Sequence, residues 1–316
     1  MGYLDRSDNT ENIHRTPSLN EGVFQANHMT DRRNFLKQGS LLIAGSALAP
    51  RFASAFPGNA PLGSFGLQLY TLRDVLPKDP KGILKQVSTM GYTQLESFEG
   101  DQGMFWGLGN KGFKKYVGDL GMTTISSHCD CTPGAFDKKA AEAGEIGMKY
   151  LINAWIGPQK TLDDYKRRAE EFNVAGATCR KNGIRFAYHN HGYTFTKQDG
   201  QYPIDILIKY SDPSLVDFEM DIYWVVVAGE NPEAWLKKYP NRFRLCHVKD
   251  RRKGADPKDE DASVNVGTGS LDWSRILGTA KAEGMRYYIL EQERYDGTTP
   301  IECASVGGTY LKKLTI

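Results

Sequence analysis

The repeating unit of this chain is clearest in residues 160–191, which read KTLDDYKRRAEEFNVAGATCRKNGIRFAYHNH. Its first part predicts a helix over residues 160–181, because six apolar residues share one stripe at helical spacing: Leu162, Tyr165, Ala169, Phe172, Ala175 and Cys179. Gly176 lies on the same stripe, where a missing side chain allows close packing at some cost in helix propensity. Gly183 predicts the end of the helix, and the apolar run 184–189 predicts a buried strand.

The same order of elements recurs along the chain from Phe65 onward. Short apolar runs, bounded by turn residues and followed by helical patterns, predict eight strands at 65–70, 93–98, 122–127, 149–155, 184–189, 215–221, 242–248 and 286–291. Gly91, Gly121 and Gly284 precede strands as Gly183 does. Eight such units in about 250 residues predict a single (β/α)₈ TIM barrel. The alternative, a doubly wound open sheet, needs a glycine-rich phosphate loop after an early strand, which the sequence lacks.

Composition excludes several classes of partner. The chain has 316 residues, and 40 basic residues nearly balance 38 acidic ones, which gives no reason to expect nucleic acid or a membrane surface as a partner. Apart from the N-terminal segment, no apolar run reaches the ~20 residues that span a bilayer. Five scattered cysteines do not form a disulfide framework and are predicted to be free thiols: Cys129, Cys131, Cys179, Cys246 and Cys303.

The N-terminal segment carries an export signal. Residues 30–37, TDRRNFLK, resemble the twin-arginine motif, and a weakly apolar stretch at 41–49 and Ala53-Ser54-Ala55 follow in the order that signal peptidase requires. We therefore predict a twin-arginine signal peptide over 29–55, transient contact with the export machinery, cleavage after Ala55 and a periplasmic domain over 56–316 without stable membrane insertion. Residues 1–28 are polar and lack periodicity, so we interpret them as a non-native or disordered extension, with translation starting at Met29. N-terminal sequencing of the precursor checks that start.

Side chains that bind metals gather at the predicted strand ends. In a TIM barrel these ends form the catalytic mouth. All four histidines after residue 55 lie there: His128, His189, His191 and His247. Asp221 ends the sixth strand, and Glu291 and Glu293 end the eighth. Imidazole with carboxylate ligands suits Mn²⁺, Co²⁺, Zn²⁺ or Fe²⁺ better than Ca²⁺, so we predict one divalent metal ion at the mouth.

Five residues are candidates for contact with a substrate, and His191 is one of them if His189 is the metal ligand on strand five. Lys249 follows His247 by two residues, so it should face the same mouth and contact a substrate oxygen or oxyanion, unless it is a surface lysine paired with Asp250. His128 is a candidate for binding a hydroxyl group. Glu96 and Trp155 are candidates for lining the pocket, although packing explains them equally well.

Several stretches resemble one known superfamily. Residues 66–74 (GLQLYTLRD), 188–191 (YHNH), 247–250 (HVKD), 266–269 (VGTG) and 271–273 (LDW) are similar to the xylose-isomerase-like sugar phosphate isomerases and epimerases. The resemblance covers nearly all of the chain after the export signal. It implies one divalent ion held by side chains from strands five to eight, typically Glu, Asp, His and Glu. Asp221, His247 and Glu291 match three of these positions.

The fourth position departs from the family pattern. Where the epimerases have a glutamate, this chain has His189, with His191 two residues further on. Both histidines share one face of the strand, so spacing alone does not choose between them, and the alignment favours His189. The epimerases use two glutamates to move the proton, and one of these bases is therefore missing or moved. Lyases and dehydratases of the superfamily that act on keto-sugars or inososes are similar around this His-x-His strand.

The resemblance implies chemistry on a small sugar. We predict proton abstraction next to a carbonyl of a non-phosphorylated sugar or keto-sugar, giving an enediolate and then epimerisation, isomerisation or elimination. Glu291, Glu293 or a strand-five histidine could be the base. The main alternative is a non-catalytic periplasmic sugar-binding barrel. A nuclease resembling endonuclease IV would need more metal ligands and a basic groove, and is rejected.

Overall fold

The computed structural model describes residues 60–316. The predicted extension at 1–28, the signal peptide at 29–55 and the cleavage site after Ala55 lie outside these residues, so export and periplasmic location remain predictions. Among the residues described, no helix is both long and apolar enough to cross a membrane. In the same part of the chain all five cysteines are free thiols, as predicted.

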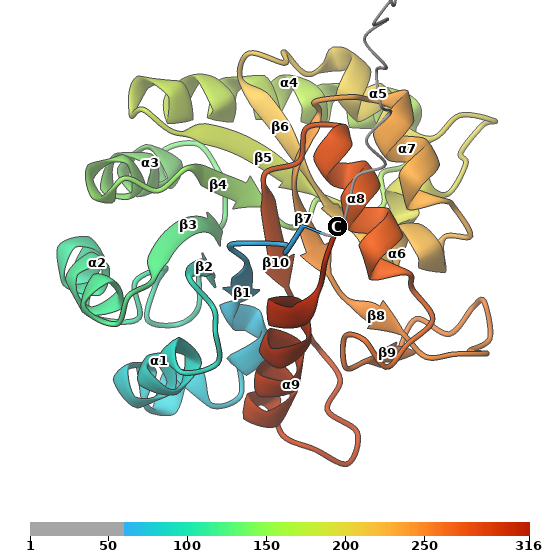
Figure 1. Cartoon of the computed structure of the whole chain (residues 1–316). Coiled ribbons are helices and arrows are strands. Elements are labelled where there is room, and N and C mark those ends of the chain that lie inside the picture. The colour runs from blue at the N-terminus through green and yellow to red at the C-terminus, as the bar shows by residue number, and fades with distance from the viewer. Residues whose placement is uncertain (1–59) are drawn as a thin grey trace, which may run out of the picture. The chain divides into compact units, whose positions relative to one another are not determined.

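Eight parallel strands form a closed barrel (Figure 1). β1 pairs with β2 on one side and with β10 on the other, which closes the sheet and excludes the open-sheet alternative. The strands are β1 (Gly66–Gln68), β2 (Gln94–Phe98), β3 (Thr123–His128), β4 (Tyr150–Asn153), β5 (Arg185–His189), β6 (Val216–Asp221), β7 (Phe243–Val248) and β10 (Tyr287–Leu290). The prediction of a (β/α)₈ TIM barrel is confirmed.

Helices surround the strands on the outside, as Figure 1 shows. They are α1 (Pro80–Ser88), α2 (Gly109–Asp119), α3 (Ala135–Ile146), α4 (Leu162–Lys181), α5 (Pro203–Tyr210), α6 (Ile222–Val227), α7 (Pro232–Lys238), α8 (Trp273–Ala282) and α9 (Pro300–Lys313). Short 3-10 helices are η1 (Leu69–Leu72), η2 (Leu76–Lys78) and η3 (Gly192–Phe195). A small antiparallel pair, β8 (Asp250–Arg251) and β9 (Ser263–Val264), lies in the loop after β7.

Helix α4 agrees with its sequence pattern. Thr161 caps its first turn, where the hydroxyl accepts a hydrogen bond from the Asp164 amide and the Asp164 carboxylate accepts one from the Thr161 amide. Gly176 allows the predicted close approach, because a Cβ there would lie 2.8 Å from the Cβ of Leu215. Gly183 has a positive φ of 74° after the helix, as a C-cap glycine should.

Two strands, β1 and β4, end two residues earlier than the apolar runs predicted, and a polar side chain ends each of them. Gln68 Oε1 accepts a hydrogen bond from the Tyr70 amide at 3.0 Å, which turns residues 69–72 into η1. Asn153 Oδ1 accepts one from the Trp155 amide at 3.1 Å, which ends β4 at Asn153. Tyr70 and Trp155 therefore lie beyond the strand ends, beside the barrel mouth.

The barrel interior is layered from bottom to top. Tyr150, Arg185 and Asp217 form a polar cluster at the strand starts. An apolar layer lies above it, built from Ile152, Ala187, Leu245 and Ile289. Polar side chains fill the layer at the strand ends. Because side chains alternate along a strand, every second residue points inward, and this places the candidate residues in the upper layer.

The start of the described chain meets its C-terminus. The Leu62 amide donates to the carbonyl of Leu314 at 2.9 Å, and the Ile316 amide donates to the carbonyl of Ala60 at 2.9 Å. These bonds join both ends of the described chain to each other just before β1.

Candidate functional site

Four predicted metal ligands lie together in the upper layer. Asp221, His247 and Glu291 bring one ligand atom each to within 4.8 Å of one another. His247 Nδ1 is 3.2 Å from Glu291 Oε2 and 3.9 Å from Asp221 Oδ2. His189 Nε2 is also 3.9 Å from Asp221 Oδ2. We call these four side chains the inner cluster.

The hydrogen bonding and the chemistry of the inner cluster both fit a divalent ion. Asp221 Oδ2 is buried and accepts no hydrogen bond from any described residue, and His247 Nδ1 has the Glu291 carboxylate at 3.2 Å as its neighbour. A buried polar atom without a partner is costly, so the unpartnered Asp221 oxygen beside an imidazole and a second carboxylate suggests a missing ligand. Two imidazoles and two carboxylates are a mixed nitrogen and oxygen set that suits Zn²⁺, Mn²⁺, Co²⁺ or Fe²⁺.

A second polar group lies behind the inner cluster and is centred on two buried glutamates. Glu96 on β2 and Glu219 on β6 are both fully buried. His247 Nε2 is 2.7 Å from Glu96 Oε1, and His189 Nδ1 is 3.0 Å from Glu219 Oε2. His128 Nε2 lies between the glutamates, 3.1 Å from Glu96 Oε1 and 2.8 Å from Glu219 Oε2. We call Glu96, His128 and Glu219 the outer triad.

The surroundings set the charges of these groups. Burial opposes charge on Glu291, but the attraction of His247 and Lys249 is stronger and lowers its pKa to about 2. Burial likewise opposes charge on His128, but Glu96 and a hydrogen bond to Glu219 raise its pKa to about 10. Burial lowers the pKa of His191 to about 3, with a contribution from Lys249. At neutral pH Glu291 is thus a carboxylate, His128 an imidazolium and His191 a neutral imidazole.

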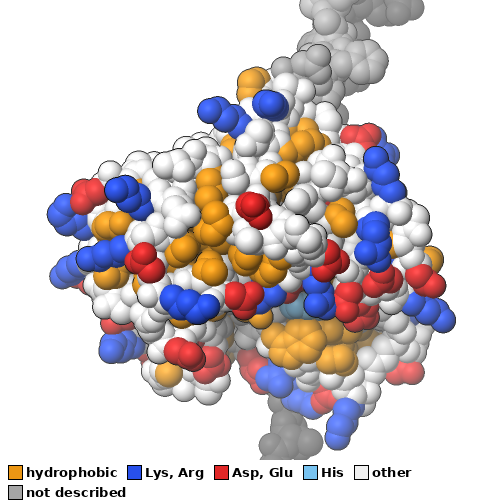
Figure 2. Space-filling model, turned by 90° about the horizontal axis from the view of Figure 1, so that it is seen from below, with side chains coloured by type: hydrophobic (Ala, Val, Ile, Leu, Met, Phe, Trp, Pro, Cys, Tyr) orange, Lys and Arg blue, Asp and Glu red, His pale blue; other side chains and the backbone are white. Residues whose placement is uncertain are grey.

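A cavity of about 600 Å³ opens above the inner cluster. Three acidic or imidazole groups reach it from the site below, namely His189, Glu291 and His128, and its aromatic walls include Tyr70, Phe98, Trp155 and Trp224. In the view from below, histidine surface is visible beside a hydrophobic area and among acidic and basic side chains (Figure 2). A pocket with aromatic walls and a polar floor is typical of small-molecule sites.

His191 and Trp155 form one side of this cavity. Their ring centroids are 4.6 Å apart in an edge-to-face contact, and Trp155 is 59% exposed. His191 Nδ1 is buried and has no hydrogen-bond partner among the described residues. The exposed indole face of Trp155 suits contact with a ring compound in this cavity.

Lys249 does not line the cavity. Its side chain is 1% exposed, and its ammonium lies in contact with Glu293 and 3.7 Å from Glu291 Oε2. The ammonium also lies 5.0 Å from the ring centre of Tyr223. Glu293 does line the cavity, and it separates the Lys249 ammonium from the cavity. Asp250 is not the partner of Lys249, because it accepts the amides of Gly267, Gly269 and Leu271.

The structure separates the predicted residues into three places. His189, Asp221, His247 and Glu291 form the inner cluster, and His128, His191, Trp155 and Glu293 line the cavity. Glu96 lies beneath the cavity rather than in its wall. His189, and not His191, is the strand-five histidine beside Asp221. The chemical roles of these residues remain predictions.

Glu219 is the residue that sequence reasoning missed. It lies two positions before Asp221 on β6, so it points inward as Asp221 does. The same spacing argument that paired His189 with His191 would have found it. Gln68 and Ser126, which donate to Glu96, carried no comparable signal because both residue types are common in packed strands.

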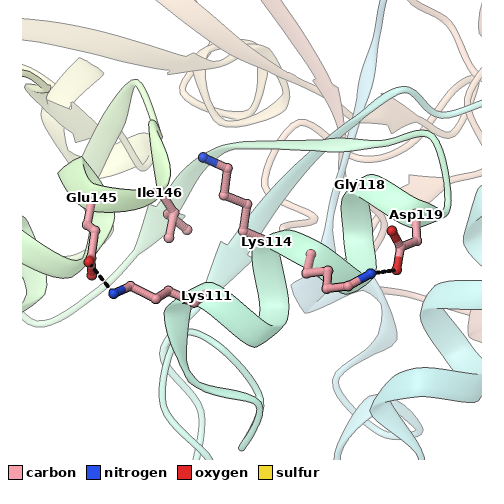
Figure 3. A pocket seen from close by; sticks show the side chains of 7 residues that line it. Lys111, Lys114, Gly118, Asp119, Glu145 and Ile146 are labelled. Carbon is pink, nitrogen blue, oxygen red and sulfur yellow. Dashed lines mark hydrogen bonds and ion pairs between the residues drawn. The ribbon is translucent and has the colours of Figure 1, made fainter.

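A hollow elsewhere on the surface offers no comparable chemistry. It lies at α2 and the end of α3, where Lys111 pairs with Glu145 at 2.7 Å and Lys115 with Asp119 at 2.6 Å (Figure 3). These side chains are exposed, and exposed ion pairs of this kind contribute little to binding or stability.

Known proteins agree with this architecture. Residues 84–308 match the model of a family described as xylose isomerase-like TIM barrel. An inosose dehydratase of Clostridium perfringens is 28% identical over 181 residues, which are 53% of this chain and 58% of that protein. This chain thus spans just over half the length of the curated relatives it matches.

Solved structures extend the likeness over more of the chain. A sugar phosphate isomerase/epimerase from Parabacteroides distasonis is 29% identical with a TM-score of 0.67, covering 83% of this chain and 96% of that one. The IolI protein, solved with a bound zinc atom, shares the fold with a TM-score of 0.62 at 14% identity, covering 78% of this chain and 95% of that one.

Proposed function

Because the chain belongs to the xylose isomerase-like TIM barrel family, we propose that it is a metal-dependent enzyme that removes a proton next to the carbonyl of a small keto-sugar or inosose. The observation that carries this proposal is the inner cluster, where Asp221, His247 and Glu291 bring ligand atoms to within 4.8 Å of one another beneath an aromatic cavity and Asp221 Oδ2 has no hydrogen-bond partner among the described residues. The names of the inosose dehydratases and of the sugar phosphate isomerase/epimerase support this class of substrate.

His189, Asp221, His247 and Glu291 would hold the divalent ion. When bound, such an ion supplies Lewis acidity, which stabilises negative charge that develops on a substrate carbonyl oxygen. Zinc in the IolI protein, which shares this fold, is consistent with an ion in such a barrel. His189 and Glu291 line the cavity, so the site is open to substrate on that side.

Glu293 is the proposed base. Its carboxylate lines the cavity and lies in contact with the Lys249 ammonium, which fixes its position there. Glu291 is assigned to the divalent ion in this proposal, so it is not available as the base. His191 lines the cavity and would contact the substrate there, and Trp155 would cover one face of the ring.

Elimination is the favoured outcome among the three reactions. Epimerisation by the family's two-glutamate route needs a carboxylate at the strand-five position, which here is His189. The outward nitrogen of His189 is already bonded to Glu219 at 3.0 Å. Glu293 would remove the proton next to the carbonyl and return it to the neighbouring hydroxyl, which would leave as water, as in a dehydratase.

Metal analysis tests this proposal first. Wild-type protein, purified without added metal and then supplied with Mn²⁺, Co²⁺, Zn²⁺ or Fe²⁺, should retain about one ion per chain. Asp221→Ala and His247→Ala should lose it, while Glu145→Ala, on the exposed surface of α3, should not. Glu293→Gln should keep the ion but exchange a keto-sugar or inosose proton with D₂O at least ~100-fold more slowly, the range expected for a lost general base.

A wild-type protein that binds none of these ions would overturn the catalytic proposal. The aromatic cavity would then support the alternative, a non-catalytic sugar-binding barrel. Metal binding without proton exchange on any keto-sugar or inosose would leave the ion but reject Glu293 as the base.

A further inference from the structure

We propose that Glu96 and Glu219 are positioning residues: each accepts the outward N–H of one inner-cluster histidine and so aims that histidine's other nitrogen at the metal position. This inference rests on the proposed metal site. It assigns a task to two buried carboxylates that neither line the cavity nor belong to the inner cluster.

Glu96 acts on His247. Its carboxylate is fully buried and accepts hydrogen bonds from Gln68 Nε2 at 2.8 Å and Ser126 Oγ at 2.5 Å. These donors hold the carboxylate in one orientation, with Oε1 2.7 Å from His247 Nε2. With Gln68 and Ser126 donating to this carboxylate, its Oε1 is oriented to accept the N–H of His247 Nε2. Nδ1 is then left to face Asp221 and Glu291.

Glu219 acts on His189 in the same way but through the opposite ring nitrogen. Its Oε2 lies 3.0 Å from His189 Nδ1 and would accept an N–H on that atom, while Nε2 faces Asp221 at 3.9 Å. The two histidines therefore bind with different atoms, His189 through Nε2 and His247 through Nδ1. Histidines that bind metals usually donate their other N–H to such an acceptor, and removing the acceptor typically costs 10–100-fold in affinity.

His128 joins the two glutamates into one unit. Its Nε2 lies within hydrogen-bonding distance of both carboxylates, and its ring stacks on His247 with centroids 5.3 Å apart and planes at 14°. The imidazolium also offsets the repulsion between two buried carboxylates that share a small space. The outer triad is thus a connected support for both histidines.

The alternative to a positioning role is that these residues bind a second metal ion. Ligand atoms of His128, His189, Glu219 and His247 also lie within 4.8 Å of one another, as a second metal site would require. The nitrogens involved already lie 2.7–3.0 Å from carboxylate oxygens, so protons occupy the space between them. The geometry favours hydrogen bonds over a second ion.

Competition for Zn²⁺ against a coloured chelator measures how much Glu96 and Glu219 contribute to the affinity for Zn²⁺. Glu96→Gln and Glu219→Gln should each bind Zn²⁺ about 10–100-fold more weakly than the wild type while still binding one ion. Glu233→Gln, a buried glutamate on α7 that bonds Thr279, is the matched control and should bind as the wild type does. Wild-type affinity in both variants, or two ions in the wild type and one in Glu219→Gln, would overturn the proposal.

Nitrogen-15 NMR of the histidine rings tests the wild type without any substitution. In the Zn²⁺-loaded protein the retained ring proton should be on Nε2 of His247 and on Nδ1 of His189. Should the wild type bind no Zn²⁺, the metal proposal fails, but the metal-free spectrum still decides whether His189 carries its proton on Nδ1. A proton on Nε2 of His189, or on Nδ1 of zinc-loaded His247, contradicts the proposed support.

Discussion

Arg185, Asp217 and Tyr150 meet inside the barrel at the end opposite the cavity. The Asp217 carboxylate, 6% exposed, accepts hydrogen bonds from Tyr150 Oη at 2.9 Å and Arg185 Nη2 at 2.9 Å. Arg185 also donates to the carbonyls of Pro213 and Ser214. The bottom of the barrel is therefore filled by paired, hydrogen-bonded charges rather than by apolar side chains.

Arg185→Met should therefore lower the free energy of unfolding by about 2–3 kcal/mol, because it leaves a buried carboxylate without its cation. Urea denaturation measures the change. Arg168→Met is the matched control, since Arg168 is exposed and pairs with an exposed Glu171, and it should cost less than about 0.5 kcal/mol. Equal effects from the two substitutions would show that Asp217 is not held by Arg185 in the way described.

Individual site residues differed in how readily the sequence revealed them. His189, Asp221, His247 and Glu291 could be predicted because strand ends in a barrel converge, and imidazoles and carboxylates at several such ends are hard to explain by packing. Spacing did not distinguish His189 from His191, since both share one strand face; the resemblance favoured His189, and the structure has His189 Nε2 3.9 Å from Asp221 Oδ2. The burial of Lys249 behind Glu293 and the direction of each histidine ring also depend on side-chain rotamers, which spacing does not determine.

Helix α4 lies against the start of β6 through a residue without a side chain. A Cβ on Gly176 would stand 2.8 Å from the Cβ of Leu215 and 2.9 Å from its carbonyl oxygen. Real Cβ atoms do not approach a backbone oxygen so closely, so either α4 or the chain at Leu215 would have to move. The apolar stripe predicted the helix, and the glycine within it marked the point of closest approach.

Gly176→Ala should lower the free energy of unfolding by about 1–3 kcal/mol, despite the higher helix propensity of alanine. Gly118→Ala in α2 isolates the propensity effect, since a Cβ there meets nothing within 4 Å, and it should raise stability by about 0.5 kcal/mol. Thermal or urea unfolding of both variants gives the comparison. A stabilised Gly176→Ala would mean that the contact with Leu215 is looser than the distances indicate.

At the scale of the whole molecule, repetition in the sequence determined the fold class. Eight apolar runs, each preceded or followed by an amphipathic helix, leave few arrangements other than a closed parallel barrel. The number of units predicted closure, but the sequence did not reveal the register that achieves it, in which Gly66 and Leu67 of β1 pair with Ile289 and Leu290 of β10. Nor did it reveal the pairing of residues 60–62 with the C-terminus, because those backbone bonds leave no pattern in side-chain types.

The proposed metal site joins one half of the barrel wall. Its four ligands come from β5, β6, β7 and the residue after β10, so an ion bound there links strands that the chain separates by up to a hundred residues. The unfolded chain does not hold these groups together, so binding stabilises only the folded state. At a free ion concentration 1,000 times the dissociation constant, the gain is about 4 kcal/mol.

Removal of the ion by a chelator should therefore lower the Tm of the wild type by about 10 °C, given about 2–4 °C per kcal/mol for a domain of this size. The Tm of Asp221→Ala should be the same with and without chelator. Arg185→Met should have a lower Tm than the wild type, and chelation should lower that Tm by about as much as it lowers the wild-type value. That pattern separates a metal site at the mouth from general instability, since Arg185 lies at the far end of the barrel. If chelation leaves the wild-type Tm unchanged although one ion per chain is measured, that ion does not link these strands, and the inner cluster loses its proposed role.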